Sequence, residues 1–190
     1  MKKVLIIIGH PQHESFSHTL ARAYKKGAQS AHASVRIIDV RTLEFDPVLW
    51  EGYGGTQVFE HDLEAAQAHI TWADHIVFVY PTWWGGLPAL LKGFVERVFL
   101  PGFAFKYEKG SGHKELLARK SARIITTAYE AVNWVEKMRA NGHKVFKYDV
   151  LEFCGMKPVH MSYIAPEGKP ESDMRAYWQK HVERLGAKLA

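Results

Sequence analysis

Residues 75–99 of this chain have the sequence HIVFVYPTWWGGLPALLKGFVERVF. Residues 75–80 form a short, almost continuous apolar run, which predicts a strand that is covered on both faces. From Leu87 onward, apolar residues recur every three or four positions, as they do on the buried face of a helix. These positions are Leu87, Leu90, Leu91, Phe94, Val95, Val98 and Phe99. A buried strand, a short loop and an amphipathic helix together make the repeating unit of a parallel α/β sheet.

The same unit recurs toward both ends of the chain. Short apolar runs predict further strands at residues 4–9, 35–40, 122–127 and 159–164. Three- and four-residue spacing predicts helices around residues 16–27, 63–70 and 174–185, and another at roughly 143–153. This alternation predicts a single α/β domain over residues 1–190, with a five-stranded parallel sheet, helices on both faces and right-handed crossovers.

Two connections in this pattern are longer than usual, at residues 41–60 and 100–116. Loops of that length in a compact domain are commonly functional. Both contain several aromatic residues, so we expect ordered segments that pack over a site or a partner subunit.

Composition and charge narrow the possible functions. The 190 residues are 47% apolar and 24% charged, which is typical of a globular domain that needs neither disulfides nor metals for stability. The net charge is +5, but Lys and Arg are scattered, and no basic stripe suggests nucleic-acid binding. The single cysteine, Cys154, lies in an apolar run and is predicted to be a core residue, so the chain suits a reducing compartment. The apolar run at residues 4–8 is too short for a signal peptide or a membrane span, which predicts a cytoplasmic protein.

In an open parallel sheet, ligands bind at the carboxyl ends of the strands, so the loops there are the candidate site. Residues 9–17, GHPQHESFS, follow the first strand and match neither G-x-G-x-x-G nor a Walker loop. They still predict an anion site, because unpaired N–H groups at a helix start and the hydroxyls of Ser15 and Ser17 would favour negative charge. Alternatively, these serines only cap the helix. Glu14 must face outward if an anion binds here.

The loops after the strands at residues 75–80 and 122–127 offer a different chemistry. Gly85 and Gly86 permit a sharp bend and a close approach of backbone to a ligand. The adjacent Trp83 and Trp84 are unlikely to point the same way, so at least one should be available to a flat ligand, although composition alone favours a core or interface role. After the strand at residues 122–127, hydroxyls reach the same edge, which is a weak signal because Thr is a good strand former.

Taken together, these segments resemble one known family. Residues 81–99, followed by Gly102-Phe103-Ala104-Phe105, closely resemble the NAD(P)H quinone oxidoreductase family. This flavodoxin-like group includes quinone reductases, FMN-dependent azoreductases and ancillary subunits of bacterial potassium efflux systems. Residues 8–17 look like the family's phosphate loop and residues 73–77 like its third-strand entry, so the resemblance extends from residue 4 to about residue 128.

The resemblance implies a flavodoxin-like doubly wound fold and a flavin cofactor, FMN with FAD as the alternative. It also implies NADPH or NADH as electron donor, a quinone-like acceptor, a homodimer and no metal. Phosphate and ribityl contacts would come from His10, Ser15, Phe16 and Ser17. The isoalloxazine ring would lie against Pro81, Thr82, Trp83, Trp84, Gly85, Thr126, Thr127 and Ala128. The substrate slot would be walled by Phe103 and Phe105 with aromatics of the 41–60 connection.

The chain departs from the family where many relatives carry a glycine pair, since it has Ala128 and Tyr129 instead. No catalytic residue can be assigned, and Tyr129 and His143 are only weak candidates for handling a proton. The expected reaction passes a hydride from the nicotinamide to the flavin and then two electrons to an acceptor in the same slot.

Three other functions fit parts of this pattern. A flavodoxin-type electron carrier shares the fold, but such carriers are generally acidic and this chain has a pI near 9.2. A regulatory subunit that docks on a membrane transporter would suit the basic excess. A binding module without flavin would be colourless and could not be reconstituted.

Overall fold

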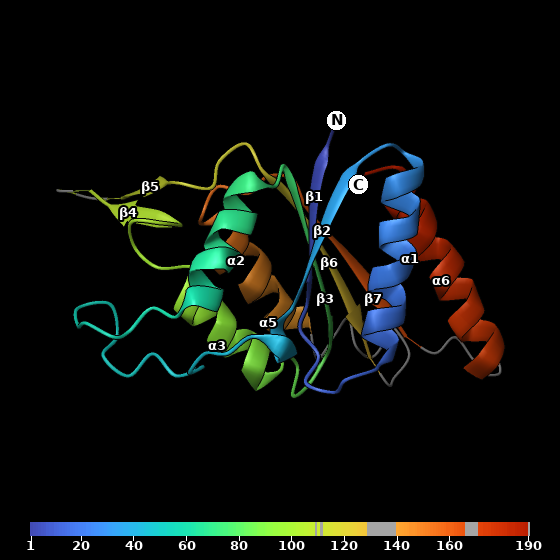
Figure 1. The fold of residues 1–190 in the computed structure, drawn as a ribbon, viewed down its shortest axis with the longest axis horizontal. Coiled ribbons are helices and arrows are strands. Elements are labelled where there is room, and N and C mark those ends of the chain that lie inside the picture. Colours follow the sequence, from blue (N-terminus) through green and yellow to red (C-terminus); the bar gives the residue numbers. More distant parts are fainter. Residues whose placement is uncertain (109, 111, 129–139, 166–170, 190) are drawn as a thin grey trace.

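The computed structural model describes residues 1–108, 110, 112–128, 140–165 and 171–189. Its main sheet has five strands, all paired in parallel, in the order β2-β1-β3-β6-β7 (Figure 1). The strands are β1 (Lys3–Ile8), β2 (Ser34–Asp39), β3 (His75–Pro81), β6 (Ser121–Thr127) and β7 (Val159–Ile164). The predicted parallel sheet is confirmed. Because β2 and β3 lie on opposite sides of β1, the strand order reverses between β1 and β3, which makes a topological switch point there.

Helices cover both faces of this sheet (Figure 1). One layer consists of α1 (Phe16–Ser30) and α6 (Glu171–Ala187). The other consists of α2 (His61–Trp72), α3 (Ala89–Val98) and α5 (Ala140–Val145). The helix expected near residues 143–153 begins earlier, at Ala140, and continues as a π-helix over Phe146–Glu152. Within the described ranges, no helix combines the length and the apolar character that crossing a membrane requires.

The side chains of the strands contribute to two apolar cores, one on each face of the sheet. In β1, Val4 and Ile6 pack toward α1 and α6, whereas Leu5 and Ile7 pack into the core that also contains Phe94 of α3. All of these side chains are fully buried. A strand buried on both faces must be apolar at successive positions, which explains why the sequence shows uninterrupted runs.

The layer formed by α1 and α6 is held by direct backbone contact. A Cβ atom added to Gly27 of α1 would lie 1.9 Å from the carbonyl oxygen of Glu183. One added to Gly186 of α6 would lie 2.2 Å from the carbonyl oxygen of Tyr24. The two helices therefore cross at a distance that only glycine permits at these positions.

The first long connection is ordered by one buried cation. Arg97 of α3 is 1% exposed and donates hydrogen bonds to the carbonyl oxygens of Asp46 and Val58. It also forms an ion pair with Glu60, with 2.7 Å between Nη2 and Oε2. Residues 41–60 are thereby tied to α3.

The second long connection contains a small antiparallel hairpin, β4 (Phe105–Tyr107) and β5 (His113–Glu115), which we did not predict. Phe105 is 5% exposed and lies against the rings of Tyr53 and Phe153. The expectation of packed connections is confirmed in part: Phe45 and Phe103 pack against the core, whereas Trp50 is 70% exposed.

Candidate functional site

Three loops meet at the carboxyl edge of the sheet, at the switch point. They follow β1, β3 and β6, which are neighbours in the sheet. The N–H of Gly9 donates to the carbonyl of Val79 at 2.9 Å, and the N–H of Thr82 donates to that of Thr127 at 2.7 Å. These bonds join the three predicted segments into one edge, as the topology rule requires.

The first loop leads into the start of α1, where a buried hydroxyl lacks a partner. Ser17 is 1% exposed, and its Oγ has no hydrogen bond to any described residue. Ser15 occupies the N-cap position, but its side chain does not cap the helix. The interpretation of both serines as mere caps is therefore wrong. The first-turn N–H groups and this unpartnered hydroxyl together form a set of hydrogen-bond donors of the kind that binds anions.

Two histidines lie beside these serines. His10 is 8% exposed, and its Nδ1 accepts a hydrogen bond from the N–H of Gln12 at 3.0 Å. Burial, with the nearby His18, lowers the pKa of His10, so the neutral ring carries its proton on Nε2. Glu14 faces outward as expected, because it is exposed and forms a two-bond ion pair with Arg22.

The second loop is a tight turn that presents both tryptophans. Trp83 and Gly86 exchange two backbone hydrogen bonds, of 3.1 and 2.9 Å. The central residues, Trp84 and Gly85, have φ values of +50° and +74°. Trp84 is fully exposed and Trp83 is 44% exposed, so the core alternative for these side chains is wrong. The ring of Trp83 contacts that of His10 edge to face, with 5.7 Å between centroids, which joins the turn to the first loop.

A non-glycine residue at positive φ costs of order 1 kcal/mol, and such strain is concentrated at functional positions. Trp84 contributes no buried contact that would offset this cost, since its side chain is fully exposed. The turn therefore holds an aromatic surface toward solvent at the edge of the site.

Beneath the turn runs a buried chain of hydrogen bonds. The Tyr80 hydroxyl lies 2.9 Å from His143 Nδ1, and His143 Nε2 lies 3.0 Å from Thr82 Oγ1. Thr82 Oγ1 in turn lies 2.8 Å from Thr126 Oγ1. Burial lowers the pKa of His143 to about 4 and raises that of Tyr80 well above its usual value. The ring of His143 is thus neutral near pH 7 and Tyr80 keeps its hydrogen, so the ring accepts one of its two hydrogen bonds and donates the other.

His143 is fully buried, so it belongs to the floor of the site rather than to its surface. The residue before it, Gly142, holds the turn from below, because a Cβ there would lie 2.0 Å from the carbonyl oxygen of Gly85. Tyr129, the other weak candidate for proton handling, lies outside the described residues.

Two site residues were missed by sequence reasoning, His18 and Asp39. His18 Nδ1 lies 2.7 Å from Ser15 Oγ, and His18 Nε2 lies 3.1 Å from Asp39 Oδ2. His18 follows Ser15 by three positions and so shares its helix face, which was a usable signal. Asp39 ends β2, the strand beside β1, and its position could have suggested the contact.

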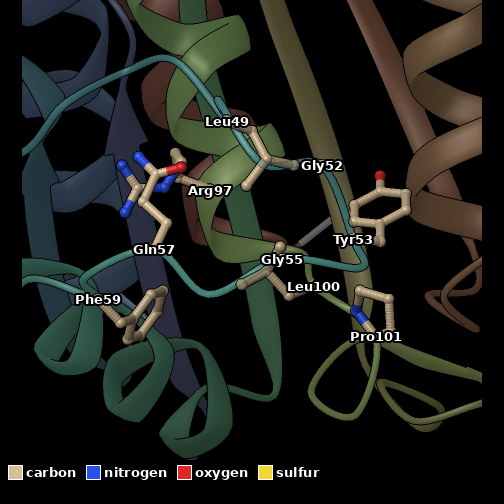
Figure 2. A pocket seen from close by; sticks show the side chains of 9 residues that line it. All are labelled: Leu49, Gly52, Tyr53, Gly55, Gln57, Phe59, Arg97, Leu100 and Pro101. Carbon is tan, nitrogen blue, oxygen red and sulfur yellow. The ribbon is translucent and has the colours of Figure 1, made fainter.

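The remaining candidates lie apart from these loops. A pocket of about 150 Å³ is located between the 41–60 connection and the end of α3 (Figure 2). It is lined by Leu49, Gly52, Tyr53, Gly55, Gln57, Phe59, Arg97, Leu100 and Pro101. Phe105 is in the core and Phe103 packs against it. Their role as walls of a substrate slot stays a prediction.

Comparisons with known proteins agree with this architecture. A family described as having a flavodoxin-like fold matches residues 2–189. NAD(P)H dehydrogenase [quinone] 1 of Cavia porcellus is 24% identical over 213 residues, covering 97% of this chain and 78% of that protein. The crystal structure of Smu.1420 from Streptococcus mutans UA159 has a TM-score of 0.82 and 31% identity, covering 98% of this chain and 99% of the other.

A second similar structure is an FMN-dependent NADH-azoreductase of Bacillus anthracis in complex with FMN. It has a TM-score of 0.73 and 20% identity over the full length of both chains, a likeness that concerns the fold alone. The resemblance of the central segment to NAD(P)H quinone oxidoreductases is confirmed by these matches. With the sheet order, the switch-point site and a family match over residues 2–189, this chain belongs to the flavodoxin-like family.

Proposed function

We propose that this protein is a flavin-dependent NAD(P)H oxidoreductase that reduces quinones or similar flat acceptors by two electrons. One structural observation carries the proposal: the buried Ser17 hydroxyl, unpartnered among the described residues, at the start of α1. Leaving such a group unsatisfied costs about 1–3 kcal/mol, so its natural partner is a ligand oxygen. The dehydrogenase name of the Cavia porcellus relative supports the same activity.

The residues present fit a flavin mononucleotide. The start of α1 offers one compact anion site, which suits the single terminal phosphate of FMN, with FAD as the alternative. His10, Ser15, Phe16 and Ser17 would hold that phosphate and the ribityl chain. Pro81, Thr82, Trp83, Trp84, Gly85, Thr126, Thr127 and Ala128 would frame the ring. When bound, the isoalloxazine ring accepts a hydride at N5 and stores two electrons.

The chain's own contribution would be positioning and desolvation. The two hydrogen bonds within the turn use the N–H groups of Trp83 and Gly86, whereas the N–H groups of Trp84 and Gly85 take no part in them. They could donate to the polar edge of a ring, while the indole surfaces exclude water from it. Holding a nicotinamide against the ring in reacting geometry would account for most of the acceleration.

A single slot for donor and acceptor predicts ping-pong kinetics. Initial-rate measurements over a grid of nicotinamide and quinone concentrations should give parallel double-reciprocal lines. Intersecting lines, which mean a ternary complex, would contradict the shared slot.

We also propose that the protein acts as a homodimer. The 41–60 connection exposes large apolar side chains, with Trp50 70% and Val58 78% exposed, and such surfaces commonly mark an interface. Phe103 and Phe105 would then wall a slot near that interface. NADPH or NADH as the electron donor belongs to this proposal, and the cytoplasmic location stays a prediction of the sequence.

The direct test is the visible absorption spectrum. The purified protein is incubated with FMN or FAD, freed of excess flavin, and then treated anaerobically with NADPH or NADH. We expect retained absorption near ~450 nm that bleaches on adding the nucleotide. No retained flavin would overturn the proposal. A retained flavin that does not bleach would favour the electron-carrier or transporter-subunit alternatives.

A further inference from the structure

Three side chains at the start of α1 form a continuous hydrogen-bonded row. Ser15 Oγ lies 2.7 Å from His18 Nδ1, and His18 Nε2 lies 3.1 Å from Asp39 Oδ2. The His18 side chain is 6% exposed and that of Asp39 is 21% exposed. Ser15 is the residue whose hydroxyl would be expected to cap α1, yet it bonds to the imidazole instead.

With a neutral imidazole, the row has only one possible arrangement of hydrogens. An ionised carboxylate can only accept, so His18 must carry its proton on Nε2 and donate it to Asp39. Nδ1 is then bare and must accept the hydrogen of Ser15. In this state Ser15 can present only lone pairs to anything else, which would repel an anion.

A protonated imidazole reverses the role of Ser15. Both ring nitrogens then carry hydrogen, so Nε2 still donates to Asp39 while Nδ1 donates to the Ser15 oxygen. The hydrogen of Ser15 is released and can be donated to a ligand. The heavy atoms need not move, because both arrangements are compatible with the same two distances.

We infer that His18 is a positioning residue for the cofactor phosphate. The phosphate binds to the protein when His18 is protonated and the Ser15 hydroxyl donates its hydrogen to the ligand. Binding of FMN is therefore coupled to uptake of a proton at His18. This inference rests on the proposed flavin site and adds to it a residue and a linkage that the resemblance does not imply.

The charges around His18 support the linkage. Asp39 is held by its own second contact, since its Oδ1 accepts from the N–H of Arg41 at 3.2 Å, so its charge stays next to the imidazole. The His10 ring lies 6.3 Å from that of His18, and the pKa of His10 is lowered by burial, so it adds no competing charge near neutral pH. Glu14 is turned outward and paired with Arg22. A phosphate arriving here would meet Asp39 uncompensated unless His18 takes up a proton.

The test compares the pH dependence of binding for FMN and for riboflavin, which lacks the phosphate. Affinities are measured by quenching of flavin fluorescence from about pH 5 to pH 8. Because the phosphate itself loses a proton near pH 6, the comparison needs the variant His18→Gln. Exposed His13, in the same loop, provides a matched control as His13→Gln.

We expect the ratio of wild-type to His18→Gln affinity for FMN to fall as the pH rises, by up to about tenfold per pH unit. Riboflavin should show no such difference, and His13→Gln should behave as the wild type. Calorimetry in buffers of different ionisation enthalpy should count extra protons taken up by the wild type. Equal pH profiles and equal proton counts for the wild type and His18→Gln would overturn the inference while leaving the flavin site intact.

Two further measurements keep the test decisive if His18→Gln folds poorly. In Asp39→Asn the new amide can donate to Nε2, so a neutral ring can carry its hydrogen on Nδ1 and Ser15 can donate to the ligand without protonation of His18. The pH dependence and the proton uptake that distinguish the wild type from His18→Gln should therefore disappear in this variant. Nitrogen-15 spectra of the labelled histidines should show both His18 nitrogens protonated once FMN is bound. A singly protonated His18 in the complex would refute the inference. A wild-type protein that binds no FMN at any pH would refute the proposed function and the inference with it.

Discussion

Replacing Ser17 with alanine should stabilise the apoprotein and weaken its hold on FMN. The Ser17 hydroxyl is 1% exposed and unpartnered among the described residues, and a buried polar group without a partner costs about 1–3 kcal/mol. Alanine removes that cost and is also the better helix former by a few tenths of a kcal/mol. The free energy of unfolding of apo Ser17→Ala should therefore rise by about 1 kcal/mol or more.

The effect on binding should have the opposite sign. A hydrogen bond to a charged phosphate contributes about 1.5–3 kcal/mol, so FMN affinity should fall by about tenfold to a hundredfold. Riboflavin affinity should be unchanged, because the lost contact is to the phosphate.

Urea denaturation of the apoprotein and fluorescence titration with both flavins measure the two effects separately. Ser30→Ala is the matched control, since Ser30 lies at the other end of α1 and its hydroxyl donates to the carbonyl of Gly27 at 2.7 Å. That variant should lose a little stability and bind FMN normally. A Ser17→Ala protein that is less stable than the wild type, or that binds FMN equally well, would refute the assignment of this hydroxyl to a ligand.

Three other predictions concern the floor of the site, two buried histidines and the edge of the site. Gly142→Ala should lower FMN affinity and turnover by about tenfold or more, as measured by titration and steady-state rates. The new Cβ would lie 2.0 Å from the carbonyl oxygen of Gly85 and must displace the turn that contains Trp83 and Trp84. Acid should destabilise the apoprotein: burial lowers the pKa values of His75 and His143 to about 4, so the unfolded chain binds protons first as the pH falls below about 6.5. The free energy of unfolding is therefore undiminished above that pH and falls toward pH 4, by about 4 kcal/mol for the two histidines together at pH 5. Urea denaturation of His75→Gln should show roughly half of that loss. Trp84→Gly should leave the stability unchanged or raise it by up to about 1 kcal/mol, because it removes the positive-φ strain, yet should slow quinone reduction; normal turnover would exclude this indole from the site.

The sheet and its helices were predictable because their signal is local. Runs such as residues 75–80 are apolar at every position since both faces are covered, and the α3 pattern repeats with the helical period. The β4–β5 hairpin was not predictable, because its strands are three residues long and mostly polar or exposed outside Phe105.

The sequence predicted which segments form the candidate site, but it did not predict the contacts between the residues of those segments. The glycine pair suggested a bend at Gly85 and Gly86, but the turn is centred one residue earlier and places Trp84 at positive φ. Asp39 reaches His18 from a different strand, a contact that depends on sheet order rather than on spacing in the sequence.

The backbone contact between α1 and α6 has a consequence for biosynthesis. Helix α1 is translated early, but the helix that packs against it is made only after every strand of the main sheet. A nascent chain on the ribosome therefore carries α1 with the face that later contacts α6 uncovered, and chaperones bind such transiently exposed surfaces.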